Sequence, residues 1–254
     1  MKEEKVFFKN SKGQKLVGML ARPTKKTTTV ILNCHGFTSG KEMQFIPALS
    51  KAIAESGFAA FRFDFTGNGE SQGEFSEGTT TQETKDISSA IDFLEKKGYK
   101  KFGVVGHSMG GGVVIGAAAS DKRIKAVCAL APSVRYHRNI KKYGLHNLLR
   151  LQFKGHFIYR KHDGREFKIT KDYVKDKKRS KFFKKAKDVT QPLLVIHGTK
   201  DTSVGFAEGV ELFHRAVNQK EFLAIGGADH NFTGYHHRQL LIDSAVLFFK
   251  RHLK

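Results

Sequence analysis

The 254-residue chain contains no tryptophan, only four prolines and only two cysteines. Both cysteines, Cys34 and Cys128, lie in apolar runs that are typical of buried strands, so we expect no disulfide framework. No run approaches the roughly 18 apolar residues that a membrane-spanning helix needs, and residues 1–20 lack the apolar region and cleavage site of a signal peptide. The sequence therefore predicts a cytoplasmic protein without a transmembrane segment.

Acidic residues are also scarce, since 24 Asp and Glu residues stand against 45 Lys and Arg residues, a formal net charge of +21. Residues 133–190 hold 19 of the Lys and Arg residues but only 5 of the acidic ones, so this segment alone carries +14. Such a segment is either a solubilising cover or a surface that binds nucleic acid or another anionic partner. It has no zinc-finger or RNP-like signature, so we expect no specific nucleic-acid partner.

The order of apolar runs predicts the fold class. A chain of this length fits one large α/β domain, and strand-like runs alternate with helix-like runs through most of it. This alternation indicates an α/β fold with a mostly parallel sheet of about eight strands, flanked by helices. The strand-like runs are residues 5–10, 14–23, 27–36, 58–65, 102–105, 124–132, 192–198 and 220–227.

The alternation breaks after the sixth strand, in residues 133–190, which we call the insertion. A helix is expected over 137–152. Two β-prone runs follow within 155–170, joined at the hairpin signal His-Asp-Gly, and a basic helical stretch covers 171–189. We therefore predict one core domain of residues 1–132 and 191–254 that carries residues 133–190 as an inserted lid of helices plus a β-hairpin.

Ser108 lies where a strand-like run meets a run of small residues, within the sequence GHSMGG. Gly106 and Gly110 stand two residues before and two residues after it. A nucleophile elbow holds its serine in a strained turn between a strand and a helix, and these two positions must lack bulk. A G-x-S-x-G match alone is weak evidence, but this context favours an elbow over an ordinary turn.

A serine at its free pKa is a poor nucleophile, so the elbow requires a histidine base and an acid that orients it. Asp201 and His230 each follow a predicted strand at its carboxyl end, where the active sites of open α/β sheets collect. Asp229 is the nearest alternative acid, but as the sequence neighbour of His230 it is poorly placed to reach that ring. We predict Ser108, Asp201 and His230 as the catalytic residues, with no metal or organic cofactor.

An oxyanion hole is the third requirement, because the tetrahedral intermediate carries negative charge, and each preorganised donor stabilises it by about 3 kcal/mol. Met109, the residue after the nucleophile, supplies one backbone N–H. The second comes from Phe37, in the loop after an apolar strand, where Gly36 lets the backbone turn inward.

With these residues in place, the chain resembles an α/β-hydrolase of the serine-hydrolase type along nearly its whole length. The motifs that carry the resemblance stand in the expected order: HGFTSGK, FRFDFTGNGESQG, GHSMGG, HGTKDTSV and GADHNF. Within the superfamily it is most similar to cinnamoyl (feruloyl) esterases and to serine-aminopeptidase-like hydrolases that resemble monoacylglycerol lipases. One departure is Asn68, which stands where relatives often carry histidine.

The resemblance implies a serine carboxylic ester hydrolase that acts through an acyl-enzyme on aromatic or medium-size acyl esters, extending to bulky aromatic diesters or polyesters. A peptidase, an amide hydrolase or a monoacylglycerol lipase on the same triad remains an alternative, as does a binding module that uses the basic insertion. The expected partner is a small, anionic or aromatic ester, and the oligomeric state stays open. We expect substrate contacts from Thr38, His107, Phe153, Tyr159 and Val204.

Overall fold

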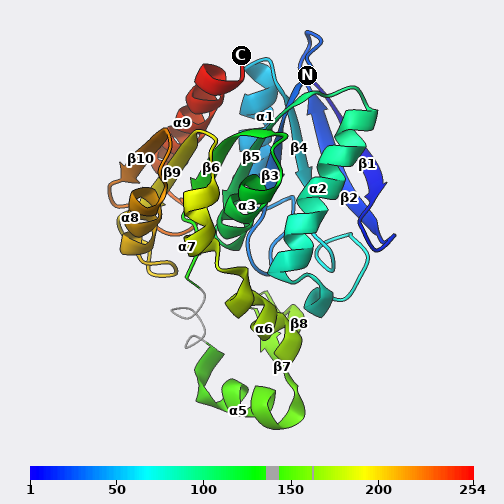
Figure 1. The fold of residues 1–254 in the computed structure, drawn as a ribbon, viewed down its shortest axis with the longest axis vertical. Coiled ribbons are helices and arrows are strands. Elements are labelled where there is room, and N and C mark those ends of the chain that lie inside the picture. The colour runs from blue at the N-terminus through cyan, green and yellow to red at the C-terminus, as the bar shows by residue number, and fades with distance from the viewer. Residues whose placement is uncertain (136–142, 162) are drawn as a thin grey trace.

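The computed structural model describes residues 1–135, 143–161 and 163–254. Within these residues eight strands form one sheet in the order β1-β2-β4-β3-β5-β6-β9-β10 (Figure 1). Strand β1 pairs antiparallel with β2 and β2 with β4, whereas all other neighbours are parallel. The predicted sheet is therefore confirmed. The strands are β1 Lys2–Lys9, β2 Lys15–Arg22, β3 Thr29–Cys34, β4 Ala59–Phe63, β5 Lys101–His107, β6 Ile124–Leu130, β9 Leu193–Gly198 and β10 Lys220–Ile225.

The central strands are buried on both faces. Every residue of β3, β4 and β9 is buried, as expected for parallel strands that carry helices on both sides. The register brings the carboxyl ends of three neighbouring strands level, because Gly106 of β5 pairs with Cys34 of β3 and with Ala129 of β6. The loops that follow these strands therefore begin side by side. Cys34 and Cys128 are both buried and unpaired.

Helices cover the two faces of the sheet (Figure 1). One apolar cluster contains α1 and α9, and another contains α2, α3 and α8. Sequence analysis left residues 199–219 without an element, and the structure places α8 there. Within the part of the chain that the structure describes, no helix combines the length and apolar character that crossing a membrane requires. The bounds are α1 Ile46–Glu55, α2 Thr80–Lys96, α3 Met109–Ser120, α8 Phe206–Arg215 and α9 Tyr235–Leu253, with a 3₁₀ helix η1 at Phe75–Glu77.

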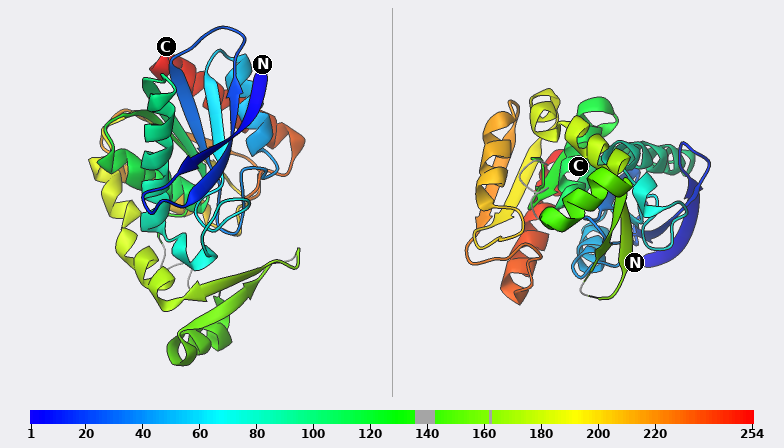
Figure 2. Two further views of the ribbon diagram at one scale, coloured as in Figure 1. Left: turned by 90° about the vertical axis from the view of Figure 1, so that its right-hand side faces the viewer. Right: turned by 90° about the horizontal axis from the view of Figure 1, so that it is seen from below.

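The described part of the insertion lies beyond one end of the sheet (Figures 1 and 2). Strands β7 and β8 pair antiparallel, but position 162 of the expected turn and positions 137–142 of the expected helix fall outside the described residues. The basic stretch is divided at Lys181, whose positive φ of 49° ends one helix before the next begins. The elements are α5 Gly144–Lys154, β7 His156–Arg160, β8 Glu166–Thr170, α6 Lys171–Ser180, α7 Phe182–Lys185 and the 3₁₀ helix η3 Ala186–Asp188.

Several sets of contacts attach the insertion to the core, among them the packing of Phe182 against the glycines of α3. A small apolar cluster joins it to η1 and consists of Phe75, Leu151, Phe157, Ile169, Tyr173 and Val174. Polar contacts tie α6 to the start of α2, because Asp176 accepts hydrogen bonds from the Thr80 hydroxyl at 2.6 Å and from the Thr81 N–H at 3.0 Å. The insertion is thus fixed next to the carboxyl ends of the strands.

Helix α3 approaches the sheet closely because its facing residues lack side chains. A Cβ on Gly110 would lie 2.5 Å from the carbonyl oxygen of His35 and 2.6 Å from that of Cys34. A Cβ on Gly106 would collide with the Gly110 carbonyl, and one on Gly116 would lie 2.6 Å from the Phe182 ring. Glycine is therefore required where β5 turns into α3.

We expect Gly110→Ala to lower the free energy of unfolding by about 1–3 kcal/mol, because its Cβ would press on backbone that cannot move independently. This cost exceeds the gain of about 0.5–1 kcal/mol that alanine brings to a helix. Urea denaturation measures the change. Gly226→Ala is the matched control, since nothing lies within 4 Å of its added Cβ. Equal stability of the two variants would contradict the close-approach argument.

Candidate active site

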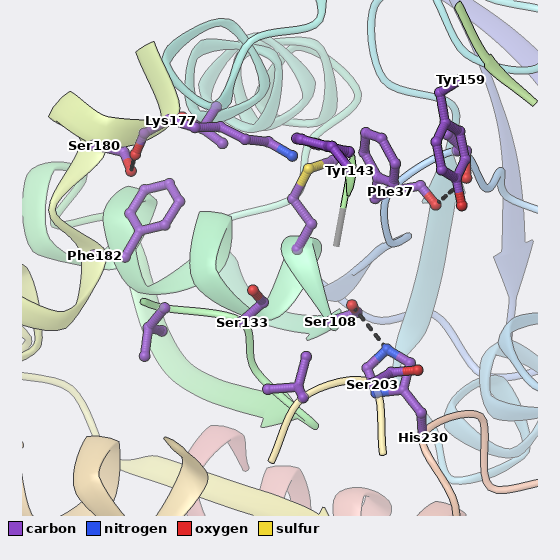
Figure 3. Close-up of a pocket in the computed structure, with 15 residues that line it drawn as sticks. Phe37, Ser108, Ser133, Tyr143, Tyr159, Lys177, Ser180, Phe182, Ser203 and His230 are labelled. Atoms are coloured by element: carbon purple, nitrogen blue, oxygen red, sulfur yellow. Dashed lines mark hydrogen bonds between the residues drawn. The ribbon is translucent and has the colours of Figure 1, made fainter. Parts of the chain in front are cut away.

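Ser108 occupies the turn between β5 and α3 with φ 56° and ψ −116°, a conformation that costs about 1–3 kcal/mol for a residue with a side chain. Three backbone hydrogen bonds hold it there. Its N–H donates to the Leu130 carbonyl at 2.8 Å, and its carbonyl accepts from the N–H groups of Ser133 at 2.9 Å and Gly112 at 3.3 Å. This turn places the Ser108 hydroxyl toward His230 (Figure 3).

A chain of two hydrogen bonds joins Ser108 to His230 and His230 to Asp201. The Ser108 Oγ lies 2.9 Å from His230 Nε2, and His230 Nδ1 lies 2.7 Å from Asp201 Oδ2. With Nδ1–H donating to the carboxylate, Nε2 is free to accept the serine proton. The three residues come from the loops after β5, β9 and β10, so the sheet brings together the three side chains that the sequence singled out.

The carboxylate of Asp201 has four hydrogen-bond partners. Oδ1 accepts from the backbone N–H groups of Ser203 and Val204, both at 2.8 Å. Oδ2 accepts a hydrogen bond from His230 Nδ1 and also lies 3.2 Å from His197 Nε2. Burial alone would raise the pKa of Asp201, but the bonds from His197 and His230 lower it well below its usual range. Asp201 is therefore ionised at neutral pH.

His197 was missed by the sequence analysis. It is fully buried at the end of β9, where its Nε2 also lies 2.9 Å from the Val204 carbonyl. Gly209 of α8 makes room for this ring, because a Cβ there would collide with His197 Nδ1. The signal in the sequence is a histidine at a strand end four residues before the predicted acid.

Asp229, the alternative acid, is engaged elsewhere. Its carboxylate accepts hydrogen bonds from the N–H and the hydroxyl of Thr233, at 2.8 and 2.9 Å. These bonds fix the start of the loop that carries His230. The carboxylate hydrogen-bonded to the His230 ring is Asp201.

His107 lies behind His230. Burial, and then the nearby His230, lower the pKa of His107 to about 3, so its ring is neutral. Its Nε2 lies 2.8 Å from the backbone carbonyl of His230, and the two ring centroids are 4.8 Å apart. His107, which we predicted to contact substrate, is only 3% exposed. It supports the backbone of His230 and also borders a groove of about 870 Å³ that reaches Ser108.

A cavity of about 330 Å³ opens beside Ser108 and contains residues from both the core and the insertion. Of the predicted substrate contacts, Thr38, Tyr159 and Val204 line it. Phe153 does not, because it points away on α5 and is 79% exposed. The lining residues are Phe37, Thr38, Thr80, Ser108, Met109, Ser133, Val134, Tyr143, Tyr159, Lys177, Ser180, Phe182, Ser203, Val204 and His230.

An aromatic group forms one wall of this cavity (Figure 3). The Phe37 ring centroid lies 5.4 Å from that of Tyr159 and 5.5 Å from that of Phe75. Phe37 and Tyr159 also border a second, larger groove of about 870 Å³ that reaches Ser108 and His230 as well. The serine is therefore accessible from two spaces, as an ester with two substituents requires.

The two predicted oxyanion-hole residues both lie at this cavity. Gly36 allows the Phe37 loop to approach Ser108 closely, since a Cβ on Gly36 would lie 3.2 Å from the Ser108 Cβ. Met109 is the first residue of α3, where a backbone N–H has no partner within its own helix. Among residues 1–135, 143–161 and 163–254, no group of three His, Cys, Asp or Glu side chains could hold a metal ion.

Comparison with known proteins agrees with this architecture. An uncharacterised 31.7 kDa protein of Escherichia coli, from the traX-finO intergenic region, is 39% identical over 101 residues, which are 39% of this chain. The match spans only 35% of that relative's length. The palmitoyl-protein thioesterase ABHD10 of Mus musculus is 24% identical over 202 residues, which are 76% of this chain and 66% of that protein.

The structure of Est1E from Butyrivibrio proteoclasticus with ferulic acid bound is similar at a TM-score of 0.80 and 24% identity. This likeness covers 98% of this chain and 99% of that one, and it shows the α/β-hydrolase fold. The family model described as serine aminopeptidase, S33, matches residues 25–182. Because this match covers more than half of the sequence, the chain belongs to that hydrolase family and has the α/β-hydrolase fold.

Proposed function

We propose that the protein is a serine carboxylic ester hydrolase in which Ser108 is the nucleophile, His230 the general base and Asp201 the orienting acid. The observation that carries this proposal is the hydrogen-bond chain from Ser108 through His230 to Asp201. The chain ends in an ionised carboxylate and begins at a hydroxyl that borders a cavity. Such a linked group converts a serine hydroxyl into a nucleophile at neutral pH.

In the proposed reaction His230 Nε2 takes the hydroxyl proton of Ser108 while the Ser108 Oγ attacks the carbonyl carbon of the ester. Asp201 stabilises the imidazolium that forms, and its fixed hydrogen bonds keep it ionised. The backbone N–H groups of Phe37 and Met109 stabilise the oxyanion. His230 then protonates the leaving alcohol, which completes the acyl-enzyme, and deacylation repeats the sequence with water as the nucleophile.

The aromatic wall favours aromatic or medium-size acyl esters as substrates. Phe37 and Tyr159 lie with their rings tilted by 59° to each other and offer an aromatic surface to a planar ring between the core and the insertion. The likeness to Est1E, whose structure contains ferulic acid, supports this choice. In this proposal residues 1–132 and 191–254 supply the chemistry, and residues 133–190 act as a lid that forms one wall of the substrate site.

Hydrolysis of amides is a second candidate, because the matching family is described as serine aminopeptidase. Amides need stronger protonation of the leaving group than esters do, and the same His230 would have to supply it. Paired assays on one acyl group, presented as a 4-nitrophenyl ester and as a 4-nitroanilide, separate the two functions. A kcat/KM for the anilide equal to that for the ester would replace the ester-hydrolase proposal.

We expect Ser108→Ala to abolish hydrolysis of 4-nitrophenyl butyrate while the protein remains folded, because the change removes only the hydroxyl. Circular dichroism checks the fold. Organophosphate labelling followed by peptide mass mapping identifies the nucleophile directly. Labelling of any serine other than Ser108 would show that the proposed nucleophile is wrong.

We expect Asp201→Asn to lower kcat by up to about 10⁴-fold, because an amide at this position favours the wrong tautomer of His230. Asp229→Asn is the matched control, since the same change on the adjacent loop affects only the contacts with Thr233. Steady-state kinetics compares the two variants. A larger loss of kcat in Asp229→Asn than in Asp201→Asn would show that Asp229, and not Asp201, is the orienting acid.

We expect Tyr159→Ala to raise KM for methyl ferulate several-fold while it leaves hydrolysis of 4-nitrophenyl acetate nearly unchanged, because only the larger substrate contacts the aromatic wall. Phe153→Ala removes an aromatic side chain from the same insertion, but outside the cavity, and should affect neither substrate. Equal losses on both esters in Tyr159→Ala would mean that the insertion does not contribute to specificity.

A further inference from the structure

A cationic cleft of about 190 Å³ adjoins the cavity at Ser108. Five of the eight residues that line it are cationic, and none of its described lining residues is acidic. The five cations are Arg135, Lys177, Lys178, Lys181 and Lys184, and the remaining lining residues are Val134, Ser180 and Phe183. This concentration of one charge in a concave space is distinct from a run of lysines on a convex surface.

The cleft and the cavity share part of their walls. Val134, Lys177 and Ser180 line both spaces. Lys177 comes from α6, and its ammonium group extends toward the aromatic wall, where Nζ lies 4.3 Å from the Phe37 ring centroid (Figure 3). A molecule that reaches from Ser108 past Lys177 therefore arrives at the other four cations.

Lys177 is held in a buried position. Its residue is 8% exposed, and Nζ also lies 4.8 Å from the Tyr173 ring centroid. Burial lowers the pKa of Lys177 to about 8, an effect that Glu83 and Asp176 oppose. The side chain is therefore mostly protonated at neutral pH, and its charge is only weakly screened by solvent.

The other cations differ in how far carboxylates neutralise them. Arg135 is paired with Glu211, at 2.6 Å. Across the described chain no salt bridge joins Lys178, Lys181 or Lys184 to an acidic side chain, whereas Lys175 on the solvent side of α6 pairs with Asp172. The lining of the cleft therefore carries a net positive charge, which attracts anions.

We propose that the substrates carry an anionic group remote from the scissile ester, and that this group binds in the cationic cleft while the ester lies at Ser108. The inference rests on the proposed ester hydrolysis and defines its substrate class. Because Lys177 lines both spaces, it contacts the portion of the substrate that links the ester to the anion. Lys178, Lys181 and Lys184 supply the attraction that brings the anion in.

The first experiment compares matched substrates that differ only in charge. On the acyl half the pair is 4-nitrophenyl hydrogen suberate and its methyl ester, and on the alcohol half it is 4-carboxyphenyl hexanoate and its methyl ester. Each kcat/KM is divided by the hydroxide rate of the same compound. We expect the anionic member of one pair to be favoured about tenfold at low ionic strength, with the preference decreasing as salt is added. Which pair responds identifies the half that enters the cleft.

The second experiment reverses one charge in the cleft. Lys178→Glu should lower the anionic-to-neutral ratio of kcat/KM by about fivefold, because one solvent-exposed attraction is lost and a repulsion replaces it. Arg179→Glu is the matched control, since it makes the same change of charge on the next residue of α6 but does not line the cleft. Lys177→Met, with its fold checked by circular dichroism, should lower the ratio by at least about tenfold.

The outcomes separate this inference from the function on which it rests. If the protein hydrolyses the neutral esters and Ser108→Ala does not, the proposed ester hydrolase stands. If, in addition, the charged and neutral members of both pairs react at equal rates, the proposed anion site is overturned. Equal effects of Lys178→Glu and Arg179→Glu would also overturn it, because they would reflect net charge alone. Failure to hydrolyse any ester would instead refute the proposed function.

Discussion

The close approach of α3 to the sheet is the constraint on which the site depends. It requires glycine at positions 106 and 110, and it forces Ser108 into a backbone conformation that residues with side chains rarely adopt. The Ser108 N–H donates a hydrogen bond to the Leu130 carbonyl at the end of β6, and the Ser133 N–H donates one to the Ser108 carbonyl, and these bonds hold the turn in place. The packing of α3 on the sheet therefore maintains the strained backbone of Ser108, and the Ser108 hydroxyl is oriented before any substrate arrives.

The electrostatics of the site follow from a single ionised carboxylate in a buried position. Four donors surround Asp201, and only one of them belongs to His230. His197 and the two backbone N–H groups offset the cost of burial, so the carboxylate can remain charged close to His230. His107 holds the backbone carbonyl of the same histidine. His230 is thus positioned by its main chain as well as by its ring.

Much of the core could be predicted because its signals are local. Apolar strands, the glycines on either side of Ser108, and the positions of Asp201 and His230 just after strands are each visible in a short stretch of sequence. The hydrogen bond from His197 to Asp201 could not be predicted from the sequence. It depends on the packing of α8 over β9, where Gly209 leaves room for the His197 ring. Phe153 was predicted as a substrate contact on aromatic character alone, and only the orientation of α5 shows that it points to solvent. The charges of the insertion were equally visible in sequence, but their convergence on one cleft depends on the helix break at Lys181.

The insertion has its own small apolar cluster, separate from the two clusters that pack on the sheet. Phe182, at the start of α7, instead belongs to a core cluster and fills the space left by the glycines of α3. The outer cluster is still linked to the elbow, because the Tyr173 hydroxyl lies 3.7 Å from the Met109 sulfur and Phe37 packs against the same cluster. A substitution in the outer cluster therefore reaches the residues next to Ser108 as well as the outer wall of the cavity. The insertion and the elbow are thus coupled, and neither can change in evolution without consequences for the other.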